Sequence, residues 1–425
     1  MRALAHSAAA VTALVAAPFA AGALILRPSW RSGLLERIGR VCADPGAVWV
    51  HAASVGEALA AIPLLDALRE AGHSVVVSAQ TLAGRDTLRR NRPDLRCRLA
   101  PLDHPWVVER ALATARPAAL VLLEAELWPC WIAAAARRRV PVALVSGRIS
   151  DRSFQRYRRV RPLARRMLRR IDAIGARSEL DARRFLELGA EPGAVTVSGD
   201  LKLDGDLVLP AAARDLSQQL SGGPLFVAGS THPGEERAAL QALRAAEAAG
   251  QGAVLVLAPR RIERSDEVER LVRAQGRRLL RRSSLERVPG GDRVRPGEVL
   301  LLDTLGELRG LWALATVAFV GGTLAPVGGH NLLEPVISGR PVLFGPHTRD
   351  VSHAVEILEK CGAGRCVADA DELARALAEL LADPAEADAR GRRGRDELVR
   401  LRGSSARSLA LLERMLADRG DRGGH

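Results

Sequence analysis

The segment GGHNLLEP carries more chemistry than a turn between a strand and a helix needs. Its glycines, Gly328 and Gly329, let the backbone approach a ligand closely. The start of the helix that follows favours a phosphate, with His330 and Asn331 beside it, and Glu334 could accept hydrogen bonds from a ribose diol. A simpler interpretation makes Asn331 a helix cap, but it leaves the glycines and His330 unexplained. The segment therefore predicts a site for a nucleotide.

Other polar residues follow apolar runs further along the chain. Ser230, Thr231 and His232 precede a predicted helix start, where an anion would sit, and the acidic residues after them suit the positive end of that helix. Arg260 ends another run, and its guanidinium suits a phosphate or a carboxylate. Lys202, near the middle of the chain, is a compact phosphate-binding charge. These residues extend the predicted anion site.

The first half carries its polar residues at two turns. HAASVGEA places Ser54 and Glu57 at the spacing of a capping box, while Gly56 and the free amides also allow an anion site. EAELWP ends a run with Glu124 and Glu126, which are two residues apart and are therefore expected on one strand face. Two such carboxylates could orient a sugar hydroxyl or act in acid–base chemistry, or they could be solvated surface.

Composition narrows the class of protein. The net charge of +13 indicates an anionic partner, whereas an aromatic content of 3% argues against single-strand nucleic-acid binding, which needs stacking platforms. The five scattered cysteines fit a reducing compartment. The DGD at 204–206 lacks supporting ligands, so no metal site is predicted. Zinc-protease, P-loop and serine-hydrolase motifs do not occur.

These side chains need elements that bring the turns together. Short apolar runs alternate with helical patterns through both halves, which predicts parallel βαβ units. A polar stretch at about 205–224 separates the halves. The fold class is therefore α/β, with two Rossmann-like domains facing a cleft. The predicted strands are 47–52, 73–79, 118–126, 141–147, 172–177, 194–199, 224–230, 252–259, 277–282, 298–303, 316–321 and 339–345.

The N-terminal region is predicted to hold the chain at a membrane. Residues 7–26 carry no charge, a length that just spans a bilayer, and the arginine-rich stretch after them favours a cytoplasmic position for the next domain. A cleaved signal peptide is the rival interpretation, and the segment could also lie in the interface. The arginine-rich run from Arg148 to Arg170 predicts a surface for anionic headgroups, or simply solvated helix faces.

Eight motifs, in family order, make nearly the whole chain resemble a known family. They are LLERIGR, WVHAASVGE, EAELWP, GRISDRSFQRYRR, GSTHPGEE, LLDTLGEL, AFVGGTL and GGHNLLEP. The chain resembles the bacterial 3-deoxy-D-manno-oct-2-ulosonic acid (Kdo) transferases of lipopolysaccharide assembly, which have the GT-B glycosyltransferase fold. We therefore expect an inner-membrane anchor at 1–28, a cytoplasmic acceptor domain at 29–205, a donor domain at 206–404, and a C-terminal helix and tail at 405–425.

The resemblance also implies a reaction. The donor would be CMP-Kdo and the acceptor the phosphorylated lipid A precursor, at anionic inner-membrane lipid, with no metal, cofactor or nucleic acid. Glu36 of LLERIGR matches the family's catalytic base, which would deprotonate an acceptor hydroxyl for an inverting attack. Glu307 of LLDTLGEL would lie near the nucleotide. Arg148 would join Ser54, Gly56, Glu57, Glu124 and Glu126 on the acceptor side or in the cleft.

The chain departs from the family's pattern at four positions. Arg261 stands where His is common, Asp200 where Asn is usual, and Asp350 and Val351 where Asn-Phe is typical. These departures put the neighbouring donor contacts in question. The alternatives to a Kdo transferase are another GT-B nucleotide-sugar transferase or epimerase, and a non-catalytic membrane-associated scaffold with the same fold.

Overall fold

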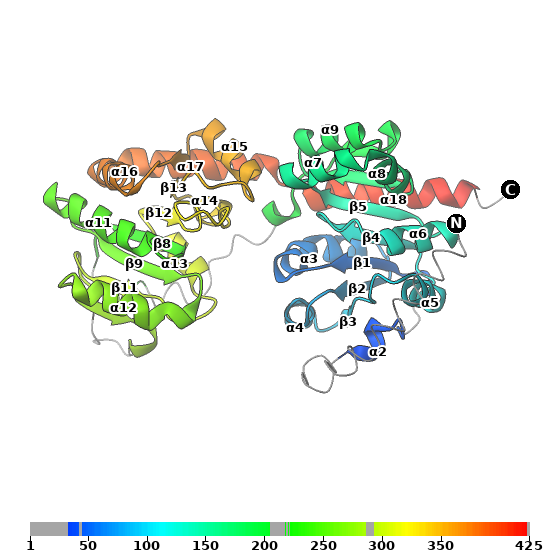
Figure 1. Cartoon of the computed structure of the whole chain (residues 1–425), viewed down its shortest axis with the longest axis horizontal. Coiled ribbons are helices and arrows are strands. Elements are labelled where there is room, and N and C mark those ends of the chain that lie inside the picture. The colour runs from blue at the N-terminus through cyan, green and yellow to red at the C-terminus, as the bar shows by residue number, and fades with distance from the viewer. Residues whose placement is uncertain are drawn as a thin grey trace. The chain divides into compact units, whose positions relative to one another are not determined.

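The computed structural model describes residues 33–41, 45–204, 217, 220, 222–285 and 293–422. The chain divides into two compact units (Figure 1). The first unit runs to residue 205 and takes in the chain again from Leu401 onward, and the second contains residues 206–400. The predicted anchor at 1–28 lies outside the described residues. Within the described part, no helix is long and apolar enough to cross a membrane.

Seven strands form the sheet of the first unit, in the order β3-β2-β1-β4-β5-β6-β7, and every pair of neighbours is parallel. The order reverses between β1 and β4, and ligands of such sheets bind at the carboxyl ends of the strands beside a reversal. The strands are β1 (Val48–Ala52), β2 (Val75–Ala79), β3 (Arg96–Leu99), β4 (Ala119–Leu123), β5 (Val142–Gly147), β6 (Ala173–Ala176) and β7 (Val195–Val197).

Helices cover this sheet because alternate strand residues present apolar side chains to both of its faces. Two separate apolar clusters, one around Trp131 and one around Leu64, form the core. The helices are α2 (Leu34–Arg37), α3 (Val55–Glu70), α4 (Leu82–Asn91), α5 (Pro105–Ala115), α6 (Pro129–Arg137), α7 (Asp151–Arg159), α8 (Arg161–Leu168), α9 (Glu179–Leu188) and the short 3₁₀ turns η2 (Pro192–Ala194) and η3 (Leu201–Leu203).

The second unit has its own parallel sheet, in the order β10-β11-β9-β8-β12-β13-β14. Here the order reverses between β8 and β12. The α/β class with two parallel sheets is thus confirmed. The strands are β8 (Leu225–Thr231), β9 (Val254–Pro259), β10 (Leu279–Arg281), β11 (Val299–Leu301), β12 (Val317–Val320), β13 (Val342–Phe344) and β14 (Gly364–Cys366).

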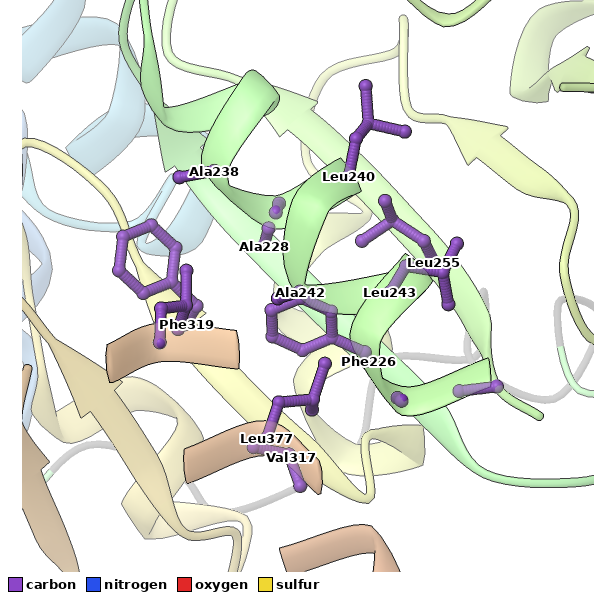
Figure 2. Close-up of a cluster of buried hydrophobic side chains, with 14 of the residues drawn as sticks. Phe226, Ala228, Ala238, Leu240, Ala242, Leu243, Leu255, Val317, Phe319 and Leu377 are labelled. Atoms are coloured by element: carbon purple, nitrogen blue, oxygen red, sulfur yellow. The ribbon is translucent and has the colours of Figure 1, made fainter. Parts of the chain in front are cut away.

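One apolar core of the second unit lies between a face of its sheet and the helices α11 and α16. Figure 2 shows Leu243 of α11 and Leu377 of α16 in one cluster with Phe226 and Phe319 of the strands. The helices are α11 (Glu235–Ala248), α12 (Ser265–Ala274), α13 (Leu308–Leu314), α14 (Leu333–Ile337), α15 (Ser352–Cys361), α16 (Ala370–Ala382), α17 (Pro384–Leu401) and the 3₁₀ turns η4 (Ile262–Arg264) and η5 (Arg282–Ser284).

The last helix, α18 (Ser404–Arg422), belongs to the first unit although the second unit precedes it in sequence. Its apolar residues Leu411, Leu412 and Met415 are buried in the same cluster as α3 (Figure 1, α18 in red). Its start is capped by Asp204, whose two carboxylate oxygens accept hydrogen bonds from Gly403 N at 2.8 Å and Ser405 N at 2.5 Å.

Candidate functional site

A buried carboxylate lies in the turn after β4, beside the reversal of strand order in the first unit. β4 ends at Leu123, so Glu124 and Glu126 lie in the turn, and the expectation that they share a strand face is wrong. Glu124 has a φ of 52°, a left-handed conformation that non-glycine residues rarely adopt. Such strain is concentrated at functional sites, which makes this turn a candidate.

Two cations neutralise Glu124. Arg148 Nε lies 2.9 Å from its Oε2, and Lys202 Nζ lies 2.5 Å from its Oε1. Burial alone would raise the pKa of Glu124, but Lys202 and Arg148 hold it below its ordinary value. The sequence groups Lys202 with the donor phosphate, whereas the structure places it in the first unit, on this carboxylate.

Glu57 and Glu126 complete this acidic cluster. Burial, followed by the charge of Glu57, raises the pKa of Glu126 to about 7, although a hydrogen bond from Trp128 Nε1 opposes the shift. Burial also raises the pKa of Glu57. At neutral pH the cluster can therefore hold a proton and can both donate and accept hydrogen bonds at a sugar hydroxyl.

The start of α3 is a capping box. Ser54 Oγ accepts a hydrogen bond from Glu57 N at 3.2 Å, and Glu57 Oε2 accepts one from Ala53 N at 2.7 Å. The carboxylate of Glu57 thus occupies the positive end of the helix, where a bound anion would sit. A Cβ atom on Gly56 would meet nothing nearer than Ser54 Oγ at 3.9 Å, so packing does not require that glycine. These contacts favour the capping interpretation.

Glu36 lies on α2, at the carboxyl end of β3. Leu99 N donates a hydrogen bond to Glu36 Oε2 at 2.7 Å, and Arg85 Nη1 lies 4.0 Å from the same oxygen. Both contacts, among the described residues, involve Oε2, so Oε1 is the oxygen left to take a proton. A quarter of the side chain, 25%, stays exposed. The carboxylate is therefore both fixed and reachable.

Two glycines beside α2 let its segment lie against β3 and α5. Gly33 has a φ of 71°, and a Cβ atom there would lie 2.3 Å from Leu99 Cδ1. Gly39 has a φ of 83°, and a Cβ atom there would lie 2.4 Å from Val107 O. Larger residues would push α2 away and move Glu36 with it, so the two glycines of this segment serve the position of the carboxylate.

Exposed apolar side chains occur on the segment that carries Glu36 and on the segment hydrogen-bonded to it. Leu35 of α2 and Ile38, directly after α2, are close to it in sequence, and Leu35 is 56% exposed. Leu102 and Trp106 come from the segment before and within the first turn of α5, and Leu102 N donates to Arg37 O at 2.9 Å. Trp106 is 46% exposed. We call Leu35, Ile38, Leu102 and Trp106 the apolar rim, and exposed patches of this kind mark partner or lipid surfaces.

In the second unit, a buried carboxylate shapes the loop after β12. Glu235 Oε1 accepts hydrogen bonds from the backbone N–H groups of Thr323, Leu324 and Ala325, at 3.0–3.1 Å. Its Oε2 accepts bonds from Gly322 N and His232 N, both at 2.8 Å. Five backbone donors therefore converge on one side chain, which ties the loop after β12 to the loop after β8.

An imidazole pair lies beside this loop, at the reversal between β8 and β12. His232 Nε2 is 2.8 Å from His330 Nε2, with the ring planes 11° apart. Burial lowers the pKa of His330, and the charge of Arg260 lowers it further. Arg260 lies directly after β9 and its side chain is exposed. Three nitrogen-bearing side chains from three loops thus meet where a parallel sheet binds ligands.

The glycines of GGHNLLEP have a different role from the predicted one. A Cβ atom on Gly328 would lie 2.2 Å from Asp350 Oδ2, and one on Gly329 would lie 2.6 Å from Val351 Cγ2. Their φ angles are 120° and 93°. They are therefore required by backbone conformation and by packing against the chain's own 350–351 segment, at two of the positions that depart from the family's pattern.

Asn331 and Glu334 of this segment form local hydrogen bonds at the start of α14. Asn331 Oδ1 accepts from Leu333 N at 3.1 Å, and Asn331 Nδ2 donates to Glu334 Oε1 at 3.2 Å. Trp312 Nε1 donates to Glu334 Oε2 at 3.3 Å. Because α14 has only five residues, its dipole contributes little to anion binding. His330 is the residue of this segment that belongs to the imidazole pair.

The other residues predicted to bind the donor differ in whether their side chains are already used in hydrogen bonds within the protein. Ser230 is half-buried, with a φ of 56°, at the end of β8. Thr231 is fully buried and donates from Oγ1 to Glu236 Oε1 at 2.8 Å, so its side chain is used in an internal hydrogen bond. Glu307 accepts from Arg282 Nη2 at 2.7 Å and from Thr304 Oγ1.

The DGD sequence does not have the surroundings of a metal site. Asp204 is occupied in capping α18, and Asp206 lies outside the described residues. No group of three or more His, Cys, Asp or Glu side chains that could hold a metal ion occurs in the described part. The described cysteines are free thiols: Cys97, Cys130, Cys361 and Cys366.

Comparison with known proteins identifies the family. Residues 32–205 match the family model described as 3-deoxy-D-manno-octulosonic-acid transferase (kdotransferase). The chain is 35% identical over 401 residues to the 3-deoxy-D-manno-octulosonic acid transferase of Bordetella pertussis, covering 90% of this chain and 92% of that protein. The chain belongs to the Kdo transferase family. It is therefore an enzyme, a glycosyltransferase that transfers Kdo.

A second relative supports the family, and a solved structure shows the fold. The 3-deoxy-D-manno-octulosonic acid transferase of Haemophilus influenzae is 32% identical over 399 residues, covering 91% of this chain and 92% of that protein. The crystal structure of UDP-GlcNAc 2-epimerase from Neisseria meningitidis bound to UDP-GlcNAc is similar with a TM-score of 0.61, covering 87% of this chain and 100% of that chain. At 12% sequence identity, that likeness shows the fold alone.

Sequence reasoning missed the contacts of two residues in these sites. His232 was predicted to precede the helix end where an anion would sit, but a lone histidine in a turn gives no sign of a partner ring 98 positions later. Glu235 was predicted to be a charge that suits a helix end, not the acceptor of the hydrogen bonds that hold a loop. The GSTHPGEE motif contains both residues, so its density of polar residues was the available signal.

Proposed function

We propose that the chain transfers Kdo from CMP-Kdo to the phosphorylated lipid A precursor during lipopolysaccharide core assembly, with Glu36 as the base. The observation that carries the assignment of the base is the Glu36 carboxylate, held through Oε2 by Leu99 N while part of the side chain stays exposed. In a GT-B enzyme of this kind the first unit, with the boundary at residue 205, binds the acceptor and the second binds the donor.

The proposed reaction is the one that the family resemblance implies. Glu36 Oε1 takes the proton of a primary hydroxyl on the acceptor sugar. The hydroxyl oxygen bonds to the anomeric carbon of Kdo from one side, the bond from that carbon to the CMP phosphate oxygen breaks on the other, and the configuration inverts. Negative charge develops on the departing phosphate, and Arg260 with His330 of the second unit offers positive charge and N–H groups to it.

The acidic cluster of the first unit is suited to sugar hydroxyls rather than to phosphate. Glu124 is already neutralised by Lys202 and Arg148. Glu126 and Glu57 both have raised pKa values, chiefly because they are buried, so a proton is available in the cluster for hydrogen bonding. We assign these carboxylates to orienting substrate hydroxyls beside the reversal of strand order.

The surroundings of Glu36 support a lipid acceptor. The apolar rim gives acyl chains or the membrane interior a surface around the base. Toward the other end of the first unit's sheet from α2, the helices α7 and α8 carry positive charge for phosphates and headgroups, and Leu163 on α8 is 67% exposed among them. The exposed arginines there are Arg152, Arg156, Arg158, Arg159, Arg161, Arg165 and Arg166. We therefore place the enzyme at the inner membrane, facing the cytoplasm.

The proposal is tested by a transfer assay with the full-length chain. CMP-Kdo and the lipid A precursor should give free CMP and a lipid heavier by Kdo residues in mass spectrometry. A chelator should leave the rate unchanged, since Asp204 is occupied in a helix cap. Consumption of a UDP- or GDP-sugar in place of CMP-Kdo would overturn the proposed donor.

A further inference from the structure

The imidazole pair of the second unit is built so that its protons are shared. A distance of 2.8 Å between the Nε2 atoms of His232 and His330 is a hydrogen-bond distance. An imidazole nitrogen donates only when it carries a proton, so one of these two atoms donates and the other accepts. Without a ligand, the pair therefore holds a single proton along this line.

The neighbouring groups keep the pair from charging fully. Arg260, from the loop after β9, and His232, from the loop after β8, both lower the pKa of His330, after the larger effect of burial. Glu235 of α11 acts in the opposite direction, but its two oxygens already accept five backbone N–H bonds. An arriving anion beside Arg260 would offset that positive charge, which otherwise opposes protonation of His330.

The loop geometry brings both rings to one point. Gly322 has a φ of 72°, and a Cβ atom there would lie 2.9 Å from His330 Cδ2, 3.0 Å from His330 Nε2 and 3.6 Å from His232 Cδ2. Only a glycine leaves room for the two imidazoles over this backbone. The loop that carries Gly322 is in turn fixed by Glu235.

We propose that His232 is a donor-binding residue, and that the His232–His330 pair takes up one proton from solvent when the phosphate of the CMP-sugar binds. The bond between the two Nε2 atoms then gives way to two N–H groups directed at phosphate oxygens, beside Arg260. The proton returns to solvent when CMP dissociates. This inference rests on the proposed function, because it takes a cytidine monophosphate group as the ligand.

Isothermal titration of CMP into the full-length chain tests the proposal. At about pH 7.5 the CMP phosphate is already a dianion, because the second pKa of a phosphate monoester is about 6. The enthalpy measured in buffers of different ionisation enthalpy gives the number of protons taken up. We expect net uptake with CMP, none with cytidine, and an affinity for CMP that rises by up to about tenfold per unit decrease in pH.

Variants assign the uptake to the pair. His232→Gln and His330→Gln should each abolish proton uptake and weaken CMP binding, with cytidine binding unchanged. His73→Gln, in the first unit, is the matched control and should behave as the parent chain does. Circular dichroism checks that each variant is folded, and the pH dependence of the parent chain tests the idea without any variant.

The outcomes separate the inference from the function on which it rests. CMP binding without proton uptake, or uptake that survives in both variants, overturns the proton-coupled role and leaves the donor assignment intact. Unchanged CMP affinity in His232→Gln removes that residue from the donor site. No binding of CMP by the folded parent chain overturns both the inference and the proposed donor.

Discussion

The amide nitrogen of Leu99 lies 2.7 Å from Oε2 of Glu36, although the two residues are 63 positions apart in the chain. A hydrogen bond from the backbone at the end of a strand is a rigid support, since it does not depend on a side-chain rotamer. The carboxylate is thus held at a constant position while its other oxygen can meet a substrate. Catalysis by a base depends on this kind of fixed geometry.

Replacing Glu36 by Gln should lower the rate of Kdo transfer by a factor of about 10²–10⁴, because the amide cannot take a proton. The amide oxygen can still accept the bond from Leu99 N, so α2 should keep its place and CMP should bind as before. The rate is measured as CMP release and the affinity by titration. Glu70→Gln, on the exposed end of α3, is the control; a variant at Glu36 with the parent rate would exclude it as the base.

Glu235→Ala should destabilise the second unit by more than about 3 kcal/mol, because five buried or partly buried N–H groups would lose their acceptor. Denaturant unfolding followed by circular dichroism measures the loss. Glu263→Ala changes an exposed glutamate in the same unit and should cost little. A small effect at Glu235 would mean that the loop after β12 does not depend on this carboxylate.

Glu126 should make the first unit less stable as pH rises. Its pKa, raised by burial to about 7 from 4.5, means that the folded chain keeps a proton which the unfolded chain has released. The stability from this proton is complete below pH 4.5 and is lost as pH rises through about 7. We therefore compare the free energy of unfolding of Glu126→Gln with that of the parent. The difference should favour the variant more at about pH 8 than at about pH 5. An equal difference at both values would argue against a raised pKa.

His51 should give the opposite pH dependence. Burial lowers the pKa of this β1 imidazole to about 4 from 6.5, so between these values the unfolded chain binds a proton that the folded chain does not. Stability is complete above pH 6.5 and falls as pH decreases toward about 4, by up to about 3 kcal/mol. Unfolding across this window should show a smaller pH dependence in His51→Gln, whereas His73→Gln should match the parent.

Much of the fold was predictable, because strands buried on both faces appear as continuous apolar runs. The two strands absent from the prediction, β3 and β14, both lie at the edge of a sheet. Their sequences are RCRL and GRC, short and interrupted by arginine, since edge strands need less apolar character. The run at 118–126 was predicted too long because polar Glu124 follows β4 without a break in pattern.

The sites were only partly predictable, because sequence places a residue after a strand without naming its partner. The pairing of Lys202 with Glu124 joins η3 to the turn after β4, and a phosphate-binding charge looks the same in sequence as an internal ion pair. Likewise, Gly328 could have admitted a phosphate or the 350–351 segment. The choice between ligand and protein as the neighbour is made by tertiary packing.

The place of α18 in the first unit has a consequence for the order in which the two units fold during synthesis. Residues 206–400 form a unit that is continuous in sequence, so it can fold while the chain is still being synthesised. The first unit cannot be completed until its last helix has left the ribosome, since Leu411 and Met415 fill the core beside α3. The half of the enzyme that is translated first is thus the half that is finished last.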